Sequence, residues 1–384
     1  MALKVSRRSD VPPFIVMDVM AAAARREAGG KDVLHLEVGQ PNTPAPALAR
    51  AAAERAIRSE LLGYTLALGE PALRERIARH YRERHGVAVP AERVAVTVGS
   101  LGAFQLAFLA AFDTGDRVAL ASPCYPSYRN ALEALGIEVV TVPCGPDTHF
   151  HPTPELLEAA LPLDGLVVAS PSNPTGSVLS RERLAALAAW CDARGVRLVS
   201  DEIYHGISYG EPAASAAEVS ASAFVVNSFS KYYSMTGWRL GWTIVPEELV
   251  RPVERLAQNF FICPPAVSQA AAVAAFDATE ELDGHVRRYA AARAVLLEAL
   301  PRLGLGGIAP PDGAFYVYAD VGHLTSDSSA FCRKLLEDTG VAITPGLDFD
   351  LARGGRTVRL SYARGPEVAA AAVDRLAAWL ARAR

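Results

Sequence analysis

Residues 228–242 read Ser-Phe-Ser-Lys-Tyr-Tyr-Ser-Met-Thr-Gly-Trp-Arg-Leu-Gly-Trp. This stretch joins two short apolar runs, 224–227 and 240–245, and each run has the length and composition of a buried strand. A lysine, Lys231, follows the first run closely, with serines before it and an arginine, Arg239, after it. The pattern predicts a cluster of charged and polar groups at the end of a buried strand.

Working outward, short runs rich in Val, Ile and Leu alternate with longer segments of helical spacing. This alternation is typical of βαβ units and predicts a largely parallel sheet, because the longer segments can cross over the sheet as helices. Strands are expected at 93–98, 117–121, 138–142, 166–169, 196–200, 224–227 and 240–245, and helices at 100–112, 126–135 and 181–194.

Beyond Pro265 the pattern changes to long Ala-rich helices, with strands expected at 314–319 and 357–362 and a helix near 328–339. We therefore expect an α/β fold with a three-layer αβα large domain around a mostly parallel seven-stranded sheet. A smaller α+β domain is expected from both chain termini. The expected bounds are 1–45 for an N-terminal arm and part of the small domain, 46–282 for the large domain and 283–384 for the rest of the small domain. Two domains suit a chain of 384 residues, which is longer than single cores usually grow.

Composition narrows the class of protein. Hydrophobic residues make up 51% of the chain, charged residues 21%, and the net charge is −4, so neither a nucleic acid nor a membrane surface is an expected partner. The five cysteines are scattered, which favours free thiols and a reducing, cytoplasmic location over a disulfide frame. There is no run of signal-peptide type and no apolar span of membrane length.

Polar residues follow the expected strands at the ends where open parallel sheets bind ligands. The sequence has Gly-Ser-Leu-Gly at 99–102, Ser-Pro-Cys-Tyr at 122–125, Ser-Pro-Ser-Asn-Pro-Thr-Gly at 170–176 and Asp-Glu-Ile-Tyr at 201–204. We expect these motifs to converge on one crevice together with Lys231. The Ser122-Pro123 and Asn173-Pro174 bonds in them are candidates for the cis form, which X-Pro bonds tolerate.

Together these motifs resemble the fold-type I, pyridoxal 5'-phosphate-dependent aminotransferases of class I and II, the aspartate aminotransferase-like family. The resemblance covers nearly the whole chain: a serine stands three residues before Lys231 and an arginine eight after it, and Arg-Leu-Ser-Tyr-Ala at 359–363 completes the family's order. It implies a homodimeric enzyme that transfers an amino group between an L-amino acid and a 2-oxo acid through a Lys231 Schiff base.

The resemblance assigns catalytic roles to Lys231, Asp201 and Tyr204. An imine of Lys231 stores a reactive carbonyl equivalent, and the freed amine can carry a proton from the substrate Cα as base and then acid. A carboxylate at Asp201 would pair with the cofactor's pyridine nitrogen and keep the ring electron-poor. Tyr204 and Asn173 match donors to the ring's phenolic oxygen, whereas Glu202 is the weaker acid candidate, expected in a supporting or surface position.

The same resemblance implies how the cofactor is held. Ser100 and the Leu101 amide stand where a helix begins and can receive a phosphate; Ser228 and Arg239 match the family's hydroxyl and guanidinium contacts. Tyr125 matches the ring that stacks on the cofactor, and Tyr64 resembles a tyrosine that reaches the phosphate from the partner subunit.

On the substrate side, Arg359 matches the arginine that binds the α-carboxylate, Gly39 lies in the loop that closes over it, and Asn173 is expected nearby. Leu101, Phe14 and Ile15 are apolar where a distal carboxylate would need a partner, and an unpaired buried charge is costly. We therefore expect a neutral amino donor, hydrophobic or aromatic, rather than aspartate.

Other functions fit less well. A β-lyase or a cyclase would use the same Lys231 and Asp201, so the motifs leave this alternative open. A cofactor-sensing regulator would need an added DNA-binding domain, and a nicotinamide dehydrogenase would need a dinucleotide-binding turn after the first strand. No metal site is expected, because His149 and His151 lack a third ligand at matching spacing and are expected at the surface.

Overall fold

A seven-stranded sheet forms the centre of the computed structural model, which describes residues 3–383. Its strands follow the order β2-β8-β7-β6-β5-β3-β4, and β8 is the one strand of this sheet that runs opposite to the other six. The prediction of a mostly parallel seven-stranded sheet is confirmed. The strands are β2 Val94–Thr97, β3 Arg117–Ser122, β4 Glu138–Pro143, β5 Gly165–Ala169, β6 Arg197–Asp201, β7 Phe224–Ser228 and β8 Gly241–Ile244.

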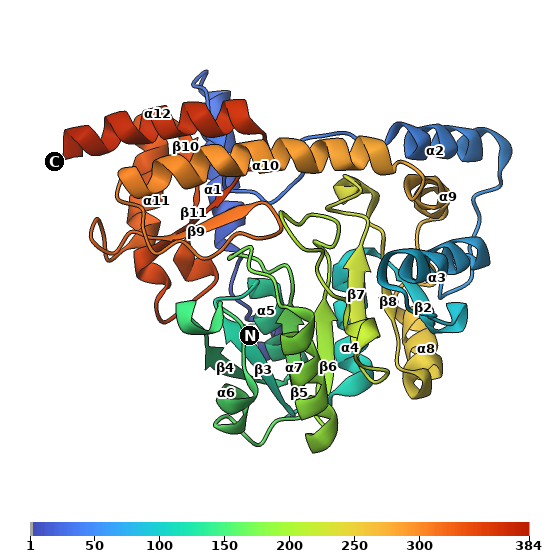
Figure 1. The fold of residues 1–384 in the computed structure, drawn as a ribbon. Helices are drawn as coiled ribbons and strands as arrows, with labels where there is room; N and C mark the ends of the chain where they lie inside the picture. The colour runs from blue at the N-terminus through green and yellow to red at the C-terminus, as the bar shows by residue number, and fades with distance from the viewer. Residues whose placement is uncertain (1–2, 384) are drawn as a thin grey trace.

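Helices cover both faces of this sheet and make the three layers (Figure 1). Successive side chains of a strand point to opposite faces: Val225 packs into one core with Trp190, while Phe224 and Val226 pack into another with Phe108. The first core takes side chains of α3 Pro71–His85, α7 Arg181–Arg194 and α9 Ala266–Ala275, and the second those of α4 Gly99–Ala111, α5 Pro126–Leu135 and α8 Val250–Phe260.

The smaller α+β unit joins the two ends of the chain. β1 Leu34–His35 pairs in parallel with β10 Val341–Ala342, and β9 Tyr316–Asp320, β12 Thr357–Ser361 and β11 Thr344–Pro345 form a separate antiparallel sheet. The helices here are α1 Ile15–Ala28, α10 Thr279–Arg302, α11 Ser328–Thr339 and α12 Pro366–Ala383; α10 and α12 pack side by side across the top of Figure 1. The fold class is therefore confirmed.

The exact domain bounds stay a prediction. The expected boundary between residues 282 and 283 falls inside the continuous helix α10, while α2 Ala47–Ser59 begins close to the expected boundary at 46. Residues 1, 2 and 384, at the ends of the terminal segments, lie outside the described part. Within residues 3–383, no helix combines the length and apolar character needed to cross a bilayer.

Local differences from the expected elements are small. β6 runs one residue further than expected, so Asp201 is its last residue, and α4 begins at Gly99. The Ser122-Pro123 and Asn173-Pro174 bonds are both cis, as expected, and Ser170-Pro171 is cis as well. The polar motifs that begin at residues 170, 201 and 228 stand at the carboxyl ends of β5, β6 and β7, which lie side by side in the sheet.

Candidate active site

A cavity of about 600 Å³ lies at these strand ends. Its walls come from both parts of the chain: the starts of α1, α4 and α5, the turn after β6, the loop 230–239, and single residues of β9 and β12. Eleven of the fourteen residues expected at the site line it, namely Phe14, Gly39, Ser100, Leu101, Tyr125, Asn173, Asp201, Tyr204, Lys231, Arg239 and Arg359. The convergence expected from the motifs is therefore present in the structure.

Lys231 is partly buried and lines this cavity. Its Nζ donates a hydrogen bond to the carbonyl oxygen of Gly39 at 2.8 Å. Burial lowers the pKa of Lys231 to about 8, and the nearby cation Arg359 acts in the same direction, against the attraction of Asp201. An amine with this pKa is partly neutral near neutral pH, as a nucleophile or a general base requires.

Asp201 faces the same cavity from the end of β6. One carboxylate oxygen accepts from the Ile203 amide at 3.0 Å, and the other accepts from the Tyr128 hydroxyl. Burial raises the pKa of Asp201 to about 6, and the hydrogen bonds from Tyr128 and Ile203 counter it. Sequence reasoning missed Tyr128; the available signal was its place three residues after Tyr125, on the same face of the first turn of α5.

Tyr204 is joined to a second tyrosine that sequence reasoning also missed. The hydroxyl oxygens of Tyr204 and Tyr316 lie 2.6 Å apart, and both residues are buried. The Tyr316 hydroxyl also lies against the backbone of Gly39: a Cβ atom added at this glycine would be only 1.7 Å from the hydroxyl oxygen. Position 39 therefore requires glycine, and the backbone there approaches Lys231 closely.

One end of the cavity is suited to an anion such as a phosphate. Ser100 and Leu101 stand in the first turn of α4, where amide groups lack partners within the helix. Arg239 lies beside them: a Cβ at Gly99, where φ is +68°, would lie 2.4 Å from its Nη2. Ser228 does not line the cavity, because its Oγ accepts from the Ser230 amide at 3.0 Å and so supports the loop from behind.

The opposite end holds Arg359, which is 3% exposed. Its Nη1 donates to Asn173 Oδ1 at 2.9 Å, and its guanidinium carbon lies 4.5 Å and 4.7 Å from the ring centres of Tyr316 and Phe349. Nε has no hydrogen-bond partner, and none of the ion pairs formed by the described residues includes Arg359. A buried guanidinium without a carboxylate is ready to bind one from a ligand.

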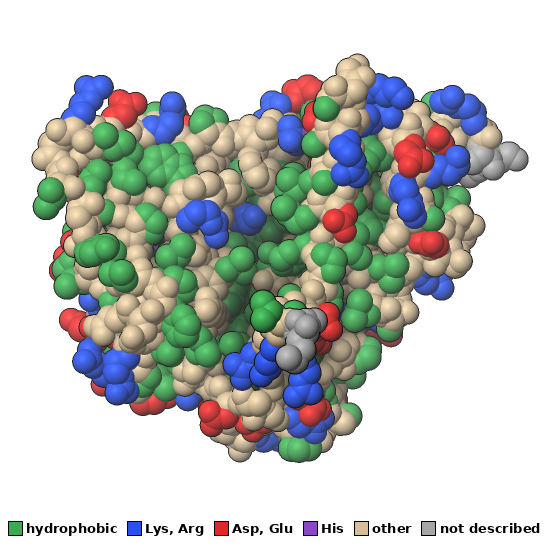
Figure 2. Space-filling model, turned by 180° about the vertical axis from the view of Figure 1, so that it is seen from behind, with side chains coloured by type: hydrophobic (Ala, Val, Ile, Leu, Met, Phe, Trp, Pro, Cys, Tyr) green, Lys and Arg blue, Asp and Glu red, His purple; other side chains and the backbone are tan. Residues whose placement is uncertain are grey.

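The wall between these ends is largely apolar. Phe14 stacks on Tyr125, with ring centres 5.8 Å apart, and Val16, Met17 and Phe104 extend the same surface. On the face of the molecule in Figure 2, hydrophobic side chains surround a central hollow.

Two expected site residues lie elsewhere. Ile15 lines a different cavity between α1 and α11, and its amide donates to Asp348 at 3.0 Å. Tyr64 is 84% exposed and does not contribute to the cavity of its own chain.

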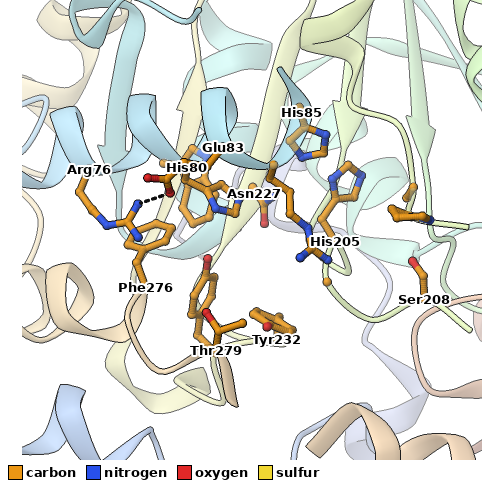
Figure 3. A pocket seen from close by; sticks show the side chains of 16 residues that line it. Arg76, His80, Glu83, His85, His205, Ser208, Asn227, Tyr232, Phe276 and Thr279 are labelled. Carbon is orange, nitrogen blue, oxygen red and sulfur yellow. Dashed lines mark hydrogen bonds and ion pairs between the residues drawn. The ribbon is translucent and has the colours of Figure 1, made fainter. Parts of the chain in front are cut away.

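Glu202 does not line this cavity; its Oε2 lies 3.5 Å from Nδ1 of His205, which lines a second and smaller cavity of about 250 Å³. Figure 3 shows that His80 and His85 reach this second cavity from α3, whereas His205 comes from the turn after β6. Each of two imidazoles has its own protein partner: His85 Nδ1 lies 3.0 Å from Glu218, and His205 Nε2 lies 3.1 Å from the Ser170 carbonyl oxygen.

The described residues contain no group of three or more His, Cys, Asp or Glu side chains arranged to hold a metal ion. One detail of the histidine prediction is wrong. His149 is exposed as expected, but His151 is 2% exposed, because the segment folds inward after the left-handed residues His149 and Phe150. Burial lowers the pKa of His151 to about 3.

Comparison with known proteins agrees with this geometry. The family described as Aminotransferase class I and II matches residues 31–376. A valine–pyruvate aminotransferase from Mycobacterium tuberculosis is 57% identical over 382 residues, which is 98% of each chain.

Solved structures agree with the sequence relatives. The crystal structure of an aminotransferase from Mycobacterium tuberculosis superposes with a TM-score of 0.97 at 56% identity, covering 99% of this chain and all of that one. The aspartate aminotransferase from Thermus thermophilus with maleate has a TM-score of 0.93 at 34% identity, covering 98% and 100% of the two chains.

The residues of the cavity fit pyridoxal 5'-phosphate, the cofactor of this family. The first turn of α4 can bind an anion, the buried carboxylate of Asp201 and the partly buried amine of Lys231 line the same cavity, and the glycine at position 99 leaves room for the Arg239 guanidinium beside the helix start. The chain belongs to the class I and II aminotransferases, pyridoxal phosphate-dependent enzymes that transfer amino groups between amino acids and 2-oxo acids.

Proposed function

We propose that this enzyme transfers the amino group of a neutral, hydrophobic amino acid to a small 2-oxo acid such as pyruvate. One observation carries the proposal: Arg359 is a buried cation without a carboxylate, and it lines the same cavity as the apolar side chains of Phe14 and Leu101. The cationic residues that line the cavity are Lys231, Arg239 and Arg359. With Arg239 at the phosphate end, no other cation among residues 3–383 lines the wall to pair with a second substrate carboxylate. The name of the valine–pyruvate relative supports the same substrate class.

We assign the cofactor contacts by the same geometry. Ser100, the Leu101 amide and Arg239 would hold the phosphate, with Ser228 supporting their loop. Asp201 would pair with the pyridine nitrogen, Tyr125 would stack on the ring, and Tyr204 and Asn173 would contact its phenolic oxygen. When bound, the cofactor supplies a ring that withdraws electrons from the substrate Cα.

The chain's own groups then perform the proton transfers. Arg359 binds the α-carboxylate and fixes the substrate Cα above Lys231, and the Gly39 carbonyl keeps the lysine amine on that side of the cavity. Lys231 Nζ would accept the proton from the substrate Cα as a base and give it up again as an acid. The apolar wall excludes water and so strengthens the electrostatic contacts inside.

A second copy of the chain completes the proposed enzyme. Leu61, Tyr64 and Leu66 are 96%, 84% and 59% exposed, and Phe260 and Ile262 are about half exposed. Side chains of this kind are usually covered by a partner. We propose that a homodimer covers them and that Tyr64 enters the partner's phosphate site. The five free cysteines favour a cytoplasmic location.

The test is a steady-state panel of amino donors with pyruvate and with 2-oxoglutarate. We expect kcat/KM for valine or leucine to exceed that for aspartate by at least about tenfold, because an unpaired carboxylate at the apolar wall costs more than about 1.4 kcal/mol. A panel led by aspartate would overturn the proposed donor class. Release of ammonia in place of an aminated product would instead indicate the lyase reaction.

A further inference from the structure

The main chain of residues 37–39 contacts both charged groups of the proposed reaction. Arg359 Nη2 donates to the carbonyl oxygen of Glu37 at 2.5 Å, and the Thr344 hydroxyl donates to the same oxygen at 2.8 Å. Two residues further on, the Gly39 carbonyl accepts from Lys231 Nζ. The Glu37 peptide is therefore one of the contacts that hold the Arg359 guanidinium, beside those from Asn173 and Thr344.

The Glu37 side chain is buried next to this peptide, with 1% exposure. Its Oε1 lies 2.8 Å from His35 Nδ1, and its Oε2 has no hydrogen-bond partner. Residues two apart in an extended chain point to the same side, which explains why His35 and Glu37 meet. On its other side, His35 Nε2 lies 3.0 Å from Glu27, a half-exposed carboxylate near the end of α1.

This arrangement favours a charged imidazole. Burial of the ring lowers the pKa of His35, but the hydrogen bonds to Glu37 and Glu27 outweigh that effect, so the pKa is raised above its ordinary value of 6.5. Arg364 is the cation that acts against protonation, and it shares a small cavity with His35 and Glu37. A buried carboxylate whose partner is removed is left uncompensated, so the Glu37 side chain depends on His35.

We propose that His35 and Glu37 are positioning residues, whose ion pair directs the Glu37 carbonyl toward Arg359 and thereby sets the guanidinium for the substrate's α-carboxylate. The inference rests on the proposed role of Arg359. Neither side chain lines the cavity itself, so the pair acts through the peptide. Its loss weakens binding of every substrate that carries an α-carboxylate and leaves proton transfer by Lys231 in place.

The test compares Glu37→Gln with the matched control Glu27→Gln in the holoenzyme. In Glu37→Gln, KM for the amino acid and for the oxo acid should both rise about tenfold, the size expected for a weakened hydrogen bond to a charged group, while kcat changes less than about threefold. Glu27 contacts His35 from the solvent side and does not touch the Glu37 peptide, so Glu27→Gln should change KM less than about twofold. An unchanged KM in Glu37→Gln would overturn the inference.

Two measurements separate positioning from general loosening of the structure. Binding of 3-methylbutanoate, a carboxylate that cannot react, should weaken about tenfold in calorimetric titration of Glu37→Gln. The single-turnover rate with a primary amine that has no carboxylate should be unchanged. Should the amine reaction slow as much as the amino acid reaction, the role is structural and the inference fails. If Glu37→Gln does not fold, His35→Gln carries the same expectations, because it removes the other half of the pair.

Arg359→Lys separates this inference from the proposed function. If Arg359→Lys leaves the KM for the amino acid unchanged, the proposed role of Arg359 is wrong, whatever Glu37→Gln does. If Arg359→Lys raises KM strongly and Glu37→Gln does not, the role of Arg359 stands and the positioning role of His35 and Glu37 falls.

Discussion

Asp201 and Glu202 are neighbours at the end of β6, yet only Asp201 lines the cavity of Lys231, whereas Glu202 is enclosed by protein groups. Both are buried, and burial raises the pKa of Asp201 to about 6 and that of Glu202 to about 8. Asp201 faces the cavity of Lys231, whereas Glu202 accepts hydrogen bonds from the Ala216 amide at 2.7 Å and the Ser215 hydroxyl at 2.8 Å. A raised pKa alone therefore does not identify a catalytic carboxylate.

Each oxygen of both carboxylates has a protein donor, so the difference lies in what else surrounds them. Around Glu202, the segment 215–218 supplies donors and closes over the carboxylate. Around Asp201, the cavity is open and contains a lysine amine and an arginine without a carboxylate partner. We infer that Asp201 serves chemistry and Glu202 serves the fold. Four substitutions test this contrast.

Lys231→Ala should have the largest effect. It removes the amine that moves the Cα proton, so kcat should fall roughly 10⁴-fold, the upper range for loss of acid–base catalysis. Single-turnover rates with an amino acid measure this, and the thermal unfolding midpoint should change little, because the Nζ has a single hydrogen bond, to Gly39. Multiple turnovers at an undiminished rate would contradict the assignment of the cavity.

Asp201→Asn comes next and tests the open side of the contrast directly. The amide keeps the shape but cannot supply the negative charge that holds the cofactor nitrogen protonated, so kcat should fall roughly 10²- to 10³-fold, as for other preorganised electrostatic groups. Reconstitution with cofactor followed by single-turnover kinetics measures the effect. A loss below about threefold would remove the distinction between the two carboxylates.

Much of this site could be predicted from the sequence, because its motifs are local. Lys231, Asp201 and Arg359 each stand at the end of a strand or within a recognisable short segment. Contacts across long stretches of chain were missed. Tyr128 and Asp201 are 73 positions apart, and Tyr204 and Tyr316 are 112 apart, so only the folded structure brings them together.

The misplacement of Ile15 has a similar physical reason. The rotation of α1 decides which side chains face the cavity, and that rotation is fixed by Asp348, whose carboxylate accepts from the amides of Ile15 and Val16. Asp348 stands 333 positions from Ile15. No local pattern reports this contact, so the sequence suggested the pair Phe14 and Ile15, whereas the structure places Phe14, Val16 and Met17 on the wall.

Tyr128→Phe should have an intermediate effect and sharpens the contrast through pH. The hydroxyl donates to the Asp201 carboxylate and lowers its pKa against the effect of burial. Without it, the pKa of Asp201 should rise, so the acidic limb of the profile of kcat/KM against pH should move to higher pH. At neutral pH we expect roughly tenfold lower activity, the size of one hydrogen bond to a charged group. An acidic limb that stays in place would show that Tyr128 does not tune Asp201.

Glu202→Gln should have the smallest effect on turnover and a clear effect on stability against pH. Since Glu202 does not reach the cavity of Lys231, kcat should change less than about threefold, against the loss of at least about 10²-fold expected for Asp201→Asn.

The pKa of Glu202 is raised in the folded state, from 4.5 to about 8, so the folded protein holds a proton that the unfolded chain releases. Stability from this group is complete below pH 4.5 and is lost as pH rises through about 8. The unfolding midpoint of the unmodified protein should fall across that window, and Glu202→Gln, which cannot ionise, should flatten the fall. If instead Glu202→Gln lowers kcat as much as Asp201→Asn does, Glu202 takes part in catalysis, and the contrast between the two neighbouring carboxylates disappears.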